Sequence, residues 1–80
     1  EQAWSNRGIL RYNKLQDYTG AKIDFDYAIR VDPKKGINYK NRARCWIKFG
    51  KKAEALLDLE TAKQLGIDVN DLMNTANALQ

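Results

Sequence analysis

Residues 3–33, AWSNRGILRYNKLQDYTGAKIDFDYAIRVDP, decide the fold because the chain repeats their pattern once. At the start of this stretch the matching positions lie 35 residues apart: Trp4 with Tyr39, Asn6 with Asn41, Arg7 with Arg42 and Gly8 with Ala43. Later the offset is 34: Leu15 with Phe49, Ala21 with Ala55, Phe25 with Leu59 and Ala28 with Ala62. A period of about 34 residues that holds two helical patterns each time predicts a solenoid of helix-turn-helix units.

The first copy predicts one helix over about 2–14 and another over about 18–31. Asp17 precedes the second helix and can cap it by accepting from a free backbone N–H. Asp32-Pro33 ends that helix, because a proline disfavours the helical conformation of the residue before it. Residues 34–36 then link the two copies.

Gly8 lies inside the first predicted helix, where it is about 1 kcal/mol less favourable than alanine. Close approach of a second helix would explain it, so we expect Gly8 to face Ala28 and, in the second copy, Ala43 to face Ala62. Helical spacing also predicts the remaining positions of the first hairpin's buried surface. On the first helix the stripe contains Ala3, Trp4, Gly8 and Leu15, with Ile9, Leu10 and Tyr12 alongside. On the second helix it includes Ala21 and Phe25, with Asp24 and Asp26 outside the buried face.

The second copy predicts helices over about 37–49 and 52–65. Gly50 and Gly66 follow them and can adopt the left-handed conformation that closes a helix C-terminus. Asp68-x-x-Asp71 resembles a capping box for a last helix over about 69–79. One face of that helix is apolar and the other carries asparagines (Asn70, Asn74 and Asn77), as expected of a helix that covers the open end of a solenoid.

The sequence therefore predicts an all-α fold: a right-handed α-solenoid of two antiparallel helix hairpins plus a capping helix, five helices in all. A single domain spans residues 1–80, with repeat one over about 2–35, repeat two over about 36–68 and the capping helix over about 69–79. The first repeat carries one extra residue between Gly8 and Leu15. We expect a wide turn in the first helix or a longer loop after it to absorb this residue, with the Tyr12 ring buried and Arg11 in water.

Composition argues against several classes of function. The chain has no histidine and only one cysteine. It therefore lacks the usual ligands of zinc and haem, and it lacks the histidine of a nucleophilic catalytic triad. A carboxylate-only mechanism or an oxygen-ligated Mg²⁺ or Ca²⁺ site stays formally open, but no acidic loop of that kind is evident. We expect no catalytic residue, cofactor or metal, and a buried, unreactive Cys45.

Location is less constrained by the sequence. No apolar run approaches the roughly 20 residues needed to span a membrane. The chain opens on Glu1 without a methionine or a signal-like region, which is typical of a processed product or an excised fragment. A cytoplasmic location is favoured, although the compartment stays open.

These residues resemble the tetratricopeptide repeat over essentially the whole chain. The motif positions are Trp4, Gly8, Ala21, Phe25, Ala28 and Pro33 in the first copy, and Tyr39, Ala43, Trp46, Gly50, Ala55, Leu59 and Ala62 in the second. Ile67 departs from the pattern, because it stands where the first copy has Pro33. The resemblance implies a protein-binding scaffold and leaves room for further repeats upstream.

The resemblance also implies that the first helix of each repeat lines a concave groove. The groove residues that we expect to bind a peptide are Asn6, Ile9, Lys40, Asn41, Arg44 and Lys48. Family members that clamp a terminal carboxylate use asparagines at the places of Asn6 and Asn41, together with nearby lysine and arginine. Gln2 and Ile37 stand where a clamp lysine would be useful, so the full clamp is absent.

Charge points to the kind of partner. Lys40, Arg44 and Lys48 recur every fourth residue and so form one basic ridge, whereas the carboxylates gather on the second and fourth helices. This distribution predicts a positive groove and a negative back that would attract an acidic peptide. The charge excess could instead only keep a structural repeat of a longer array soluble. Nucleic-acid binding through the basic stretch 34–52 is a third reading, but no stacking motif accompanies it.

The two arginines at matching places, Arg7 and Arg42, have a structural reading. We expect their stems to cover apolar surface while each guanidinium reaches an acid of a neighbouring helix.

Overall fold

The computed structural model describes residues 2–79; Glu1 and Gln80, which the predicted domain includes, lie outside the described residues. The helices are α1 (Gln2–Asn13), α2 (Tyr18–Val31), α3 (Gly36–Lys48), α4 (Lys52–Gln64) and α5 (Asn70–Asn77). Residues 2–79 contain no strand. The predicted all-α fold of two helix hairpins and a further helix is confirmed.

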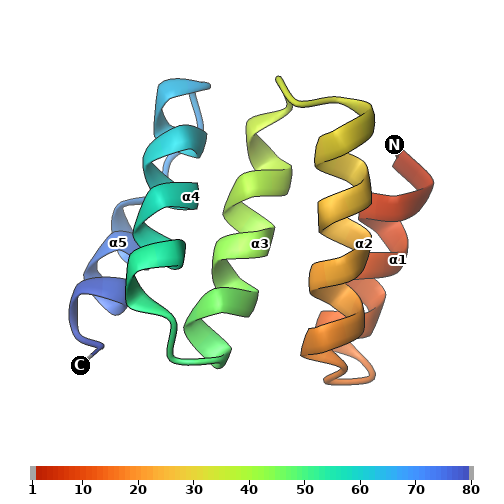
Figure 1. Ribbon diagram of the computed structural model, residues 1–80, viewed down its shortest axis with the longest axis horizontal. Coiled ribbons are helices and arrows are strands. Elements are labelled where there is room, and N and C mark those ends of the chain that lie inside the picture. Colours follow the sequence, from red (N-terminus) through yellow and green to blue (C-terminus); the bar gives the residue numbers. More distant parts are fainter. Residues whose placement is uncertain (1, 80) are drawn as a thin grey trace.

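The two hairpins, α1–α2 and α3–α4, pack side by side through α2 and α3, and α5 lies against α4. Figure 1 shows α2, α3 and α4 in a row, with α1 behind α2 and α5 behind α4. α3 lies between α2 and α4 in this row, and it also contacts both α1 and α5. None of the helices formed by residues 2–79 combines the length and apolar composition needed to cross a membrane.

The extra residue of the first copy lies in the loop after α1. This loop covers residues 14–17, one more than the loop 49–51 at the same place in the second hairpin. The Asp17 N–H donates to the Arg11 carbonyl at 2.9 Å, and Gln16 has a positive φ of 52°. Leu15 is exposed because it belongs to this loop, so its predicted place on the buried stripe is wrong. Tyr12 packs on the buried cluster as predicted.

Helix ends follow the sequence in four of the five predicted places, and α2 ends at Val31, directly before Asp32-Pro33. Asp17 accepts from the Gly20 N–H at 2.9 Å, and Gly50 and Gly66 have φ of 71° and 91°. The predicted capping box is wrong. Val69 is the N-cap of α5 and has no side-chain cap bond, and the Asp68 carboxylate accepts from the Asn70 N–H at 3.1 Å. The cause is the non-helical backbone of Val69 (φ −129°, ψ 16°), which delays the start of the helix by one residue.

The core consists of two clusters of buried side chains. Ala21, Phe25 and Cys45 join the first hairpin to α3. The other cluster contains Ala43, Ala55, Leu59, Ala62, Val69 and Ala76 and holds α5 against the second hairpin. Val69 and Ala76 are both buried, so α5 covers the second hairpin in the manner predicted for a capping helix.

The nearest neighbour of Gly8 on α2 is Phe25. A Cβ atom at Gly8 would lie 2.7 Å from Cε1 of the buried Phe25 ring, so it is this ring that requires the glycine. Ala43 and Ala62, the matching pair of the second copy, do share one cluster.

Leu10 shows how position in the stack decides burial. Its equivalent 35 residues on, Cys45, is fully buried against α2, whereas Leu10 is 50% exposed. No helix within residues 2–79 lies on α1 as α2 lies on α3. Leu10, predicted alongside the buried stripe, therefore stays exposed, and the predicted place of Ala3 on the stripe is wrong because Ala3 is exposed as well.

Candidate functional site

An ion pair joins the two helices of each hairpin. Arg7 of α1 donates to Asp24 of α2 at 2.8 to 3.2 Å, and Arg42 of α3 donates to Asp58 of α4 at 2.8 Å from two nitrogens. The predicted role of the two arginines is thus confirmed. Hydrogen bonds to Asp58 raise the pKa of Arg42, against the opposite effect of burial.

Asp24 is fully buried, so its predicted place outside the buried face is wrong. The carboxylate lies between α1 and α2, where Arg7 and Arg11 neutralise its charge. Asp58 is buried in the same way beneath Arg42 and Trp46. These two carboxylates do not contribute to the predicted negative back, because each is buried between two helices and paired there with an arginine.

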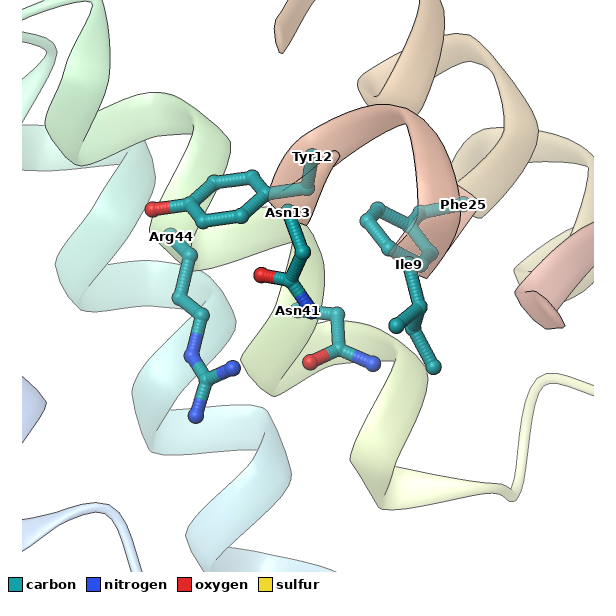
Figure 2. A pocket seen from close by; sticks show the side chains of 6 residues that line it. All are labelled: Ile9, Tyr12, Asn13, Phe25, Asn41 and Arg44. Atoms are coloured by element: carbon teal, nitrogen blue, oxygen red, sulfur yellow. The ribbon is translucent and has the colours of Figure 1, made fainter. Parts of the chain in front are cut away.

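The first part of the site is a shallow hollow between α1 and α3, which we call the α1–α3 hollow. It has about 10 Å³ of space, enough for about one water. Its lining consists of Ile9, Tyr12 and Asn13 of α1, Phe25 of α2, and Asn41 and Arg44 of α3. In Figure 2 the Asn41 amide lies between the Arg44 guanidinium on one side and Ile9 on the other.

Asn41 is the least exposed polar residue of this lining, with only 6% of its surface accessible. No hydrogen bond joins its side-chain amide to another residue between 2 and 79. Every fully buried side-chain nitrogen or oxygen in that range has a partner, so the amide must reach the surface of the hollow. A narrow opening lined by Ile9 and Arg44 therefore exposes a nearly buried donor and acceptor.

The second part of the site, the α3–α5 hollow, has about 210 Å³ of space. Lys40 and Arg44 of α3 line one side, and the chain from Asp68 to Leu72 lines the other. Arg44 belongs to both linings, so the two hollows adjoin at its side chain. Val69, which is buried, also belongs to this lining, so the hollow has an apolar component beside its charged side chains.

The predicted groove residues are thus only partly brought together. Ile9, Asn41 and Arg44 line the α1–α3 hollow, and Lys40 and Arg44 line the α3–α5 hollow. Asn6 is exposed and accepts from the Gln2 amide at 3.0 Å, so it differs from its equivalent Asn41. Lys48 lies 5.3 Å from the centre of the Tyr18 ring, away from both linings.

Asp68 and Asp71 are site residues that the sequence reasoning assigned only to a helix cap. The helix-cap interpretation was sufficient to explain two acids at the start of a helix, because acidic side chains are stabilised by the positive end of the helix dipole. The available signal was the apolar Val69 between them, which anchors this segment beside α3.

Metal binding and cysteine reactivity are the other two kinds of chemistry that the described residues could in principle support. Between residues 2 and 79, no three Cys, Asp or Glu side chains are grouped so that they could hold a metal ion. Cys45 is fully buried, and this burial raises the pKa of its thiol to about 12, so very little reactive thiolate forms near neutral pH.

Comparisons of the chain with protein-family models, curated proteins and solved structures found no match. The tetratricopeptide resemblance accordingly stays a prediction from the motif residues.

Proposed function

We propose that this chain is a tetratricopeptide-like module that holds a segment of a protein partner along α1, α3 and α5. The observation that carries the proposal is the pair of adjoining hollows, with Arg44 in both and the Asn41 amide at the surface of one. An acidic side chain of the partner would meet Lys40 and Arg44. The Asn41 amide would hydrogen-bond the partner's backbone, and Ile9, which is 41% exposed, would contact an apolar side chain.

The size of the hollows favours a peptide over a small molecule or cofactor. Sites for small molecules usually enclose about 300–1,000 Å³ and bury most of the ligand. The larger hollow has about 210 Å³ and the smaller about 10 Å³. The larger space suits a single side chain of a segment that lies across the surface, and the smaller one admits only a water or a single hydrogen-bonding group. Helical repeats bind such segments along an extended face.

Nucleic-acid binding through the stretch 34–52 is less well supported. Arg42 in this stretch is engaged with Asp58 and Asp26, and Lys35 donates to Gln2. Most of the large rings contact one another, as in the Trp4–Tyr27 and Tyr12–Tyr18 pairs, so few open faces are left for bases to stack on.

One observation favours the alternative of a structural unit within a longer array. Ala3 and Leu10 are exposed, whereas their equivalents on α3, Asn38 and Cys45, are fully buried against the first hairpin. A further hairpin could pack on α1 through these positions. Such packing would use the outer face of α1 and would leave both hollows open, so it is compatible with peptide binding.

The test is an NMR titration of the ¹⁵N-labelled chain with a short acidic peptide. We expect shifts of the Lys40, Asn41 and Arg44 amides and weak affinity, on the order of tens of micromolar or poorer, falling as salt increases. Lys40→Ala combined with Arg44→Ala should abolish binding. The control is Lys34→Ala with Lys63→Ala, which removes the same charge from exposed positions outside both hollows.

Equal losses in the two double variants would refute a defined site, because only net charge would then matter. A single-stranded oligonucleotide is the competitor that separates the partners. If it displaces the peptide and binds more tightly, the nucleic-acid reading replaces ours.

A further inference from the structure

We infer that the α3–α5 hollow selects a segment that carries one acidic and one basic side chain close together, rather than a segment that is acidic throughout. The inference rests on the proposed peptide-binding function and specifies the partner. It departs from the acidic peptide that the basic ridge alone suggests.

The charges of the hollow have opposite signs on its two sides. Lys40 and Arg44 stand one turn apart on α3, and Asp68 and Asp71 stand across the opening at the start of α5. Both acids are exposed, whereas Asp24 and Asp58 are buried beneath arginines. The hollow therefore presents a cationic side and an anionic side to a bound segment.

These charges do not neutralise one another. Elsewhere in the described chain, acids and bases close to 2.8–3.5 Å, as in Arg7–Asp24 and Arg11–Asp24. No ion pair within residues 2–79 joins Lys40 or Arg44 to Asp68 or Asp71. The space of about 210 Å³ separates the two sides, so each remains available to a ligand.

An entirely acidic segment would be attracted by one side of this hollow and repelled by the other. Screening does not remove the repulsion, because the Debye length of about 8–10 Å at ordinary salt exceeds the separation of neighbouring side chains in one site. A segment with both signs can place its acid at Lys40 and Arg44 and its base at Asp68 and Asp71. The buried Val69 would lie beneath the aliphatic part of the basic side chain.

The test uses four short peptides, acetylated and amidated, with the same neutral flanks. Each has two charged residues separated by one glycine: two glutamates, two lysines, or one of each in either order. Titration at low salt is followed by the NMR shifts of the Lys40, Arg44 and Asp71 amides. We expect one of the mixed peptides to bind about two- to fivefold more tightly than the peptide with two glutamates, which is the range for one exposed ion pair.

Asp71→Asn should remove this preference and should not weaken the peptide with two glutamates. Asp71→Glu should retain the preference, because it keeps the charge. Asp68→Asn is a second variant that keeps an oxygen to accept from the Asn70 N–H, so loss of the fold does not confuse its result. The matched control is Glu60→Gln, which removes one exposed carboxylate from α4, outside the hollow.

The outcomes separate the two proposals. If the peptides shift the Lys40 and Arg44 amides but the peptide with two glutamates binds at least as tightly as both mixed ones, the mixed-charge inference is wrong and peptide binding stands. The mixed-charge inference is also wrong if Glu60→Gln changes the preference as much as Asp71→Asn does. If none of the peptides shifts these amides, both proposals fail.

Discussion

Gly8 and Phe25 fill one space between α1 and α2, so a larger residue at one position requires a smaller residue at the other. A Cβ atom at Gly8 would lie 2.7 Å from Cε1 and 2.9 Å from Cζ of Phe25, whereas carbon atoms in favourable contact are about 3.5–4.0 Å apart. The ring is 1% exposed, and the hollow that it lines has only about 10 Å³ of space, less than a shift of the whole ring requires. The second hairpin has a larger residue on one helix, Ala43, and a smaller one on the other, Leu59. We therefore expect the substitution of one member to be tolerated only with the other.

The single substitutions should both destabilise the chain. Gly8→Ala gains about 1 kcal/mol of helix propensity but overpacks the core by about 1–3 kcal/mol, for a net loss of up to about 2 kcal/mol. Phe25→Leu leaves a cavity where the ring was and should lose about 1–3 kcal/mol, less than the 3–5 of a change to alanine. In the double variant the added methyl group occupies part of this cavity. The two changes should therefore couple favourably by about 1–2 kcal/mol.

Urea denaturation and thermal unfolding followed by circular dichroism would measure the cycle. A coupling of 1 kcal/mol corresponds to about 4–8 °C in Tm for a domain of this size. The control is Ala43→Gly at the matching place of the second hairpin, where Leu59 stands in place of Phe25; the lost helix propensity and the lost buried methyl group should together cost about 2 kcal/mol. Changes that add within about 0.5 kcal/mol would show that Gly8 and Phe25 do not share space, and the reasoning would be refuted.

Two further predictions concern buried polar groups. Arg42→Met should destabilise the chain by about 3–5 kcal/mol because it leaves the Asp58 carboxylate buried and without its cation, whereas Arg7→Met should cost less because Arg11 remains 3.5 Å from Asp24. Urea midpoints of the two variants compare them, and equal losses would contradict the role given to Arg11. Burial raises the pKa of Cys45 from an ordinary 9.0 to about 12, so the folded state favours the neutral thiol. Its stabilisation is complete below pH 9 and is lost as the pH rises from 9 to about 12. The Tm of Cys45→Ala should therefore fall less over this range than that of the parent, and parallel curves would show that the thiol is not buried.

Helix positions were predictable because local signals and the repeat agree. Asp17, Gly50 and Gly66 end or begin helices through backbone chemistry that depends on one or two residues. The extra residue between Gly8 and Leu15 was visible as a change of offset, but not its location. The structure places it in the loop after α1, which is one residue longer than its counterpart and contains the hydrogen bond from the Asp17 N–H to the Arg11 carbonyl.

Burial of Asp24 was mispredicted because the buried face was identified from the spacing of apolar residues, and this criterion never assigns an acidic residue to the interior. The sequence nevertheless held a signal in its two copies. Arg7 and Arg42 match at one offset, and Asp24 and Asp58 match at the other. An arginine and an acid that recur together on the two helices of a hairpin point to a pair that spans it. The structure shows this pair twice, at 2.8 Å between the closest atoms in both.

The candidate site was only partly predictable, because it depends on how α5 lies against α3. A helical ridge such as Lys40–Arg44–Lys48 follows from spacing alone. The packing of Val69 then decides which part of the ridge faces α5, and it brings Asp68 and Asp71 opposite Lys40 and Arg44 but leaves Lys48 near Tyr18. Three basic residues that look equivalent in the sequence therefore have different surroundings in the fold. The selectivity proposed for the site follows from this division, since Asp68 and Asp71 share a hollow with Lys40 and Arg44, and Lys48 does not line that hollow.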